Sequence, residues 1–168
     1  MELWNAYTRD GVLTEQILVR DEPIPDGLYH LVSEILVRHT DGSYLAMRRT
    51  ANKKVFPGWL ETTAGGSALL GENALACAHR ELLEETGIDS TAFTEIARIV
   101  NDSNHTIYLC YLCTVDIDKR AITFQEGETD GYLWMNEGEF IEFINSDRMI
   151  PGQKKRLGAY FEKMGYIR

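Results

Sequence analysis

The sequence predicts an α/β layered domain. Segments rich in branched and aromatic residues, typical of strands, alternate along the chain with segments of helical periodicity. The chain has 168 residues, of which 44% are hydrophobic, and this is enough for one domain with a proper core. We find no internal repeat and no low-complexity tract. We therefore expect residues 1–168 to form a single domain.

The first 27 residues predict a β-hairpin and a connector. Strands are expected over Leu3–Tyr7 and Leu13–Val19, with a turn at Asp10-Gly11. Residues 21–27 (DEPIPDG) are rich in turn formers and should form a surface connection. The chain should then enter the main sheet at about residue 30.

The next segment predicts a second hairpin. Its strands are expected over His30–Arg38 and Tyr44–Arg48, around a turn at Asp41-Gly42. A broken basic segment, Arg48–Pro57, follows, and then a short strand over Glu61–Gly66 that ends in a glycine pair. The basic segment therefore lies directly before a glycine corner.

A helix is expected over Asn73–Thr86. Leu75, Ala78 and Leu82 should face the core, with the acidic residues roughly opposite, and Gly87 suits a left-handed C-terminal cap. The remaining expected elements are strands over Thr94–Val100, Thr106–Val115 and Tyr132–Met135, a polar loop over Lys119–Gly131, and amphipathic helices over Gly138–Asn145 and Lys154–Met164.

The charge of the chain limits its partners. A formal net charge of −9 disfavours binding to nucleic-acid polymers and to anionic membranes. No apolar run reaches membrane-span length, and the N-terminus has no signal-peptide pattern. Of the three cysteines, Cys110 and Cys113 are separated by two residues but lie in an apolar run typical of a strand. We therefore interpret them, and Cys77, as buried reduced thiols rather than as a zinc or redox pair. A cytoplasmic location is the resulting expectation.

Three acids gather on the predicted helix. Glu81, Glu84 and Glu85 lie at spacings that place them on one patch, where like charges repel. The patch is either a solvated acidic face, with Arg80 as a partial counter-charge, or a site for a hard divalent cation that neutralises the carboxylates. The local sequence favours neither interpretation.

The wider frame around these acids resembles the signature of the Nudix hydrolase family. The matching positions, at the family's spacing, are Gly66, Glu72, Arg80, Glu81, Leu82, Glu84, Glu85, Gly87 and Ile88, within residues 66–88. The resemblance implies the fold of that family, an αβα sandwich with a mixed β-sheet, here with an N-terminal β-hairpin extension. It also favours the cation interpretation of the acids.

The resemblance implies roles for individual residues. Glu81, Glu84 and Glu85, with the Gly65 carbonyl, would hold one to three Mg²⁺ or Mn²⁺ ions. Arg80 would hold Glu72 or a ligand carboxylate in place. For the catalytic base the candidates are Glu81 and a loop acid, Glu128, which an ordinary exposed position explains equally well.

The basic segment supplies candidate phosphate ligands. Arg49 and Lys53 precede the glycine corner, and they either bind substrate phosphates or belong to a solvated basic loop. The layout of residues 3–88, together with the strand that ends at Trp134, also resembles the isopentenyl-diphosphate isomerase branch, in which these two positions bind diphosphate. That branch uses a cysteine within the segment that here reads Thr62–Ser67, where none is present.

The isomerase metal ligands are also largely missing. Of the histidines, only His30 is matched, and Ser67 replaces another. We therefore predict metal-dependent hydrolysis of a P–O–P bond in a nucleoside diphosphate linked to another moiety, by water attack. The alternatives are isopentenyl-diphosphate isomerase activity and a non-catalytic nucleotide-binding module. The expected partner is a small-molecule diphosphate. The sequence leaves the oligomeric state open, and the resemblance adds a homodimer as one option, because dimers are frequent in that family.

Overall fold

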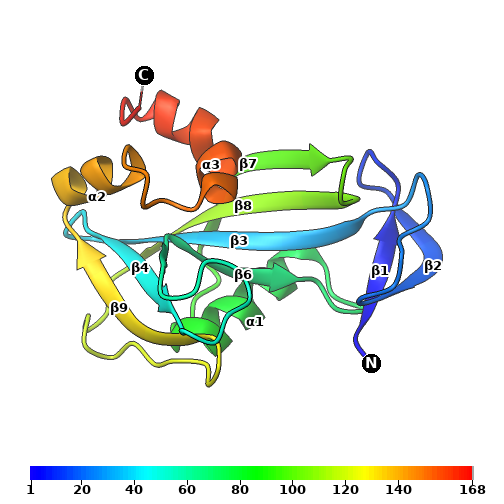
Figure 1. The fold of residues 1–168 in the computed structure, drawn as a ribbon, viewed down its shortest axis with the longest axis horizontal. Helices are drawn as coiled ribbons and strands as arrows, with labels where there is room; N and C mark the ends of the chain where they lie inside the picture. Colours follow the sequence, from blue (N-terminus) through cyan, green and yellow to red (C-terminus); the bar gives the residue numbers. More distant parts are fainter. Residues whose placement is uncertain (168) are drawn as a thin grey trace.

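A mixed β-sheet lies between helices on both of its faces (Figure 1). The computed structural model describes residues 1–167. The strands are β1 (Leu3–Tyr7), β2 (Leu13–Val19), β3 (His30–His39), β4 (Tyr44–Arg49), β5 (Leu60–Glu61), β6 (Thr63–Ser67), β7 (Phe93–Asn101), β8 (Thr106–Val115) and β9 (Thr129–Met135), and the helices are α1 (Ala74–Thr86), α2 (Glu137–Ile144) and α3 (Pro151–Lys163).

Strand β3 forms the centre of the main sheet. It runs parallel to β8, from the pair His30 and Thr106 to the pair His39 and Val115, and β7 extends the sheet beyond β8. Its side chains alternate between two cores: Ile35 packs on the α1 side, whereas Leu36 packs on the side of α2 and α3. The predicted αβα sandwich with a mixed sheet is therefore confirmed.

The second hairpin differs from its prediction. β3 and β4 pair only where Arg38 meets Tyr44, and β4 then leaves to pair with β5 and β9. The reason is competition, because β6 occupies the edge of β3 from Val32 to Leu36 that a full hairpin would need. The expected strand over residues 61–66 is accordingly two strands. The chain changes partner at Thr62, whose N–H is bound by the Gln153 side chain at 3.1 Å.

Helix α1 begins and ends where the caps predict. The Asn73 side chain accepts a hydrogen bond from the Ala76 N–H at 2.9 Å, and Gly87 closes the helix at φ +74°. Leu75, however, is half exposed, and Ala74 packs against the core in its place. Ala78 and Leu82 are fully buried, as predicted, and Cys77 and Thr86 complete the buried stripe.

The acids of α1 differ in their exposure to solvent. Cys77, Glu81 and Glu85 follow one another at intervals of four residues, so they form a single ridge along the helix. Cys77 is fully buried and Glu81 and Glu85 are half-buried, while only Glu84 is exposed. The expectation that all three acids point away from the core was therefore wrong.

The C-terminal elements match their predictions within a few residues. β9 begins at Thr129, which pairs with Arg49, so the predicted loop over residues 119–131 is shorter than expected. Helix α2 carries a capping box between Asn136 and Glu139, and α3 begins at Pro151. No helix within residues 1–167 is long and apolar enough to cross a membrane.

The predicted N-terminal hairpin is present and forms a sheet of its own. β1 and β2 pair from Leu3 and Val19 onward, and the hairpin lies at the end of the molecule near the start of β3 (Figure 1). A bridge between Tyr7 and Tyr29 joins it to the main body. The Trp4 ring stacks on the His30 ring, with centroids 4.4 Å apart.

Candidate active site

The acids of α1 lie on one side of a large cleft. The cleft has a volume of about 580 Å³ and is open to solvent. Its charged lining residues come from several elements: Glu2, Arg20, Asp21, Glu34, Arg49, Lys53, Glu61, Arg80, Glu81, Glu84, Glu85 and Glu128. They include the charged side chains predicted to bind metal or phosphate, and also Arg80 and Glu128, whereas Glu72 does not line the cleft. The volume is within the range of about 300–1,000 Å³ typical of small-molecule sites.

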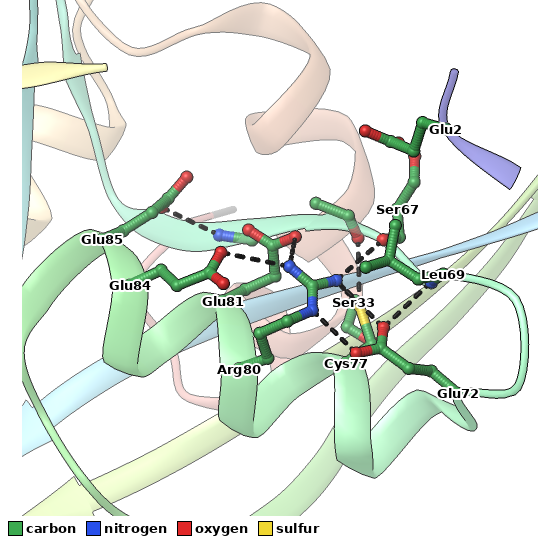
Figure 2. A network of polar contacts seen from close by, with 12 residues as sticks. Glu2, Ser33, Ser67, Leu69, Glu72, Cys77, Arg80, Glu81, Glu84 and Glu85 are labelled. Atoms are coloured by element: carbon green, nitrogen blue, oxygen red, sulfur yellow. Dashed lines mark hydrogen bonds and ion pairs between the residues drawn. The ribbon is translucent and has the colours of Figure 1, made fainter. Parts of the chain in front are cut away.

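Arg80 is the central residue of this cluster (Figure 2). Its Nε and Nη2 donate to the two oxygens of Glu72 at 2.7 and 2.9 Å. Its Nη1 donates to Glu81 at 2.7 Å and to Glu84 at 3.2 Å. These hydrogen bonds lower the pKa of the Glu72 carboxyl and raise that of the Arg80 guanidinium. Arg80 thus binds Glu72, as expected, and two of the predicted metal ligands as well.

The glycine pair leaves room for the carboxylates. A Cβ atom at residue 66 would lie 2.4 Å from Oε1 of Glu81, so only glycine fits there without moving that side chain. At the neighbouring position, the Gly65 N–H donates to Oε2 of Glu85 at 3.1 Å, and an added Cβ would meet the Ser33 carbonyl oxygen at 2.1 Å. Gly65 is therefore required by a close approach of backbone, and Gly66 by the observed position of the Glu81 carboxylate.

Burial dominates the electrostatics of two of the acids. Burial, together with the smaller effect of the nearby Glu61 and Glu81 carboxylates, raises the pKa of Glu85 to about 8. Burial also raises the pKa of Glu81, against the lowering effect of Arg80. Carboxylates that disfavour one another's charge in this way are suited to a shared cation, and an all-oxygen donor set fits Mg²⁺ or Mn²⁺.

The three predicted ligands share a patch but do not meet at one point. Within residues 1–167, no three histidine, cysteine or acidic side chains are arranged to hold a metal ion. The contacts explain this, because Arg80 holds Glu81 and Glu84 while Glu85 turns to the Gly65 N–H, as Figure 2 shows. Glu81 and Glu84 would have to exchange Arg80 for the ion.

The predicted phosphate ligands lie in the cleft, each paired with an acid. Arg49 donates from Nη1 to both oxygens of Glu61, at 3.0 and 2.9 Å, and Lys53 forms an ion pair with Glu128. Burial raises the pKa of Glu61, against the lowering effect of Arg49. Glu61 was not predicted from the sequence. Its position on β5, directly before the glycine corner, is the signal that could have identified it.

Other polar residues near the cleft have structural roles. The three thiols are free and buried, as predicted, and burial raises the pKa of Cys77 to about 11. His30 contacts Trp4 and binds Thr106 Oγ1 at 2.7 Å, and burial lowers its pKa to about 4. No bound ion is needed to explain either residue.

The comparisons with known proteins agree with this fold. Residues 28–157 match the NUDIX domain model. A Nudix hydrolase of Yersinia pestis is 44% identical over 141 residues, covering 81% of this chain and 73% of that protein. The chain therefore belongs to the NUDIX domain family.

Solved structures share the fold at lower identity. A protein from Deinococcus radiodurans has a TM-score of 0.68 and 18% identity, covering 88% of this chain and 91% of its own. The NUDIX domain of Shewanella oneidensis NrtR, in complex with ADP-ribose, has a TM-score of 0.55 and 14% identity. The match covers 68% of this chain and 77% of that domain's chain. The isomerase branch is not specifically supported by these comparisons, which place the chain among Nudix hydrolases.

Proposed function

We propose that this chain hydrolyses the P–O–P bond of a nucleoside diphosphate linked to another moiety, with Mg²⁺ or Mn²⁺ as cofactor. The supporting observation is that two sets of opposite charge share one cleft. Half-buried carboxylates of α1 lie on one side, and the cations Arg49 and Lys53 lie on another. Cleavage of a diphosphate needs both, because the acids hold a metal ion and the cations bind phosphoryl oxygens.

The metal-binding part of the proposal rests on the donor set. Glu81, Glu84, Glu85 and the Gly65 carbonyl would hold one to three ions. When bound, the ions would neutralise phosphoryl oxygens and lower the pKa of an attacking water. Arg80 positions Glu81 through its bidentate anchor on Glu72, which fixes the guanidinium on that side.

The chain's own residues supply the remaining steps. Arg49 and Lys53 bind the phosphoryl oxygens, and Glu81 or Glu128 takes the proton from the attacking water. A phosphate that takes over Lys53 releases the Glu128 carboxylate from its ion pair. Substrate binding and the availability of this second candidate base are therefore linked.

A panel of diphosphates tests the proposal. The protein is assayed with Mg²⁺, with Mn²⁺ and with chelator against ADP-ribose, nucleotide sugars, coenzyme A and nucleoside triphosphates, and released phosphate is measured after phosphatase treatment. We expect metal-dependent release from at least one compound. Binding without turnover would instead support the non-catalytic nucleotide-binding alternative.

The isomerase alternative has its own assay, the formation of allylic diphosphate from isopentenyl diphosphate. It is disfavoured because the segment Thr62–Ser67 lacks a cysteine, and the nearby Cys77 is buried with a raised pKa. The proposal further includes one functional unit over residues 1–168, a cytoplasmic location and a homodimer. Light scattering of the purified chain tests the last of these.

A further inference from the structure

The N-terminal hairpin forms one wall of the cleft. Glu2, Trp4, Arg20 and Asp21 line it, although all four precede the residues that match the NUDIX domain. Figure 2 shows Glu2 above Ser67 and Leu69, on the side of the network that faces away from Glu85. The cleft therefore extends beyond the acids of α1 and ends at the hairpin.

A chain of contacts holds Arg20 at this wall. The Trp4 ring stacks on His30 at 4.4 Å, and its Nε1 donates to Oε1 of Glu2 at 2.7 Å. The other oxygen of Glu2 accepts from Nη1 of Arg20 at 2.9 Å. Since Trp4 is buried, the series is anchored in the body of the protein.

Arg20 is the cation of the cleft that is most available to a ligand. The side chains of Arg49, Lys53 and Arg80 are only 17%, 23% and 23% exposed, and that of Arg20 is 57% exposed. Of the three guanidinium nitrogens of Arg20, only Nη1 has a hydrogen-bond partner among residues 1–167. Nε and Nη2 therefore remain available as donors.

Arg20 lines the same cleft as Lys53 and Glu128. The hydrogen bond to Glu2 is the largest cause of its raised pKa, and Glu128 adds to the effect. Glu128 is the partner of Lys53. A ligand that occupies the length of the cleft would therefore meet both Lys53 and the Arg20 guanidinium.

We propose that Arg20 forms a subsite for a second anionic group of the substrate, a phosphate or a carboxylate remote from the scissile diphosphate. The subsite rests on the proposed hydrolase function. A planar guanidinium with two free nitrogens matches such groups, which accept parallel hydrogen bonds. Because Glu2 and Asp21 keep this wall from being strongly positive, the subsite selects by hydrogen-bond geometry rather than by net charge.

Matched compounds and a matched variant test the subsite. Coenzyme A and dephospho-coenzyme A differ by one phosphate, and UDP-glucuronic acid and UDP-glucose differ by one carboxylate. The variants are Arg20→Ala and the control Arg9→Ala. Arg9 is similarly exposed, at 59%, but it pairs with Asp102 and does not line the cleft.

We expect Arg20→Ala to raise the KM of the charged member of at least one pair about tenfold, a loss of about 1.4 kcal/mol. The KM of the member that lacks the additional anionic group, and both kcat values, should stay within about twofold of wild type. Arg9→Ala should change none of these values. The pair that responds identifies the anion as phosphate or carboxylate.

Three results would overturn the subsite. One is equal behaviour of the two variants, another is an equal rise in KM for both members of each pair, and the third is a wild-type protein that does not distinguish the members. If the wild type hydrolyses no compound, the hydrolase proposal fails and calorimetric binding of the same pairs replaces KM. Tighter wild-type binding of a charged member, lost in Arg20→Ala, would then support the subsite, and its absence would refute it.

Discussion

Gly66→Ala should inactivate the enzyme with little effect on folding. The new methyl group would lie 2.4 Å from Oε1 of Glu81, where an ordinary contact begins at 3.4 Å, so the carboxylate must retreat by about 1 Å. The side chain can make this movement by rotation, and φ of Gly66 is not in the left-handed region, so the backbone tolerates alanine. A misplacement of about 1 Å at a catalytic group costs on the order of 100-fold in rate, or about 2.7 kcal/mol.

The assay compares kcat/KM with Mg²⁺ on the best substrate of the diphosphate panel, with the melting temperature measured in parallel. Gly158→Ala is the matched control, because a Cβ there meets nothing within 4 Å and the residue is inside α3. This variant should keep full activity and gain up to about 1 kcal/mol in stability. A folded Gly66→Ala protein with an activity within about threefold of wild type would show that the position of Glu81 does not matter for turnover.

Three further predictions concern residues around the cleft. Glu84→Gln and Glu85→Gln should each lower turnover at least ~100-fold, because a charge that stabilises the transition state is lost; wild-type Mg²⁺-dependent rates in either would remove that acid from the site. Arg49→Ala should raise the KM for any diphosphate about tenfold in steady-state assays, and an unchanged KM would exclude a contact with substrate. The pKa of His30 falls from 6.5 in the unfolded chain to about 4 in the fold, because burial disfavours the imidazolium. The unfolded chain therefore binds more protons, and stability should fall as the pH drops from 6.5 to 4, by about 3 kcal/mol at most. Urea titrations at pH 7 and pH 4 should show a smaller loss for His30→Gln than for wild type, and equal losses would refute this assignment.

The sequence predicted elements well where the signal was local. Asn73 and Gly87 mark the ends of α1, and the alternation around Ile35 and Leu36 identifies a strand buried on both faces. Pairing between strands was predicted less well. The departure of β4 from β3 depends on β6, which competes for the same edge, and no local pattern at residues 44–49 carries that information.

The prediction of the site succeeded and failed along the same line, between local spacing and contacts made by distant segments. The spacing of Glu81, Glu84 and Glu85 predicts that they share a patch, but not that Arg80 bridges two of them. Glu61 and Arg20 enter the cleft from elements that are distant in sequence from α1. For Glu61 the adjacent glycine corner is a local signal, whereas Arg20 reaches the cleft only through tertiary packing of the hairpin, which sequence spacing does not carry.

The parallel pairing of β3 with β8 has a consequence for how the chain acquires its structure. The residues that pair at the start of these strands, His30 and Thr106, are 76 positions apart. Contacts of such high sequence separation slow folding, because a long loop must close before they form. During synthesis β3 can pair with β6 but cannot gain its parallel partner β8 until Val115 has left the ribosome, so one edge of the central strand stays unpaired and open to aggregation for that time.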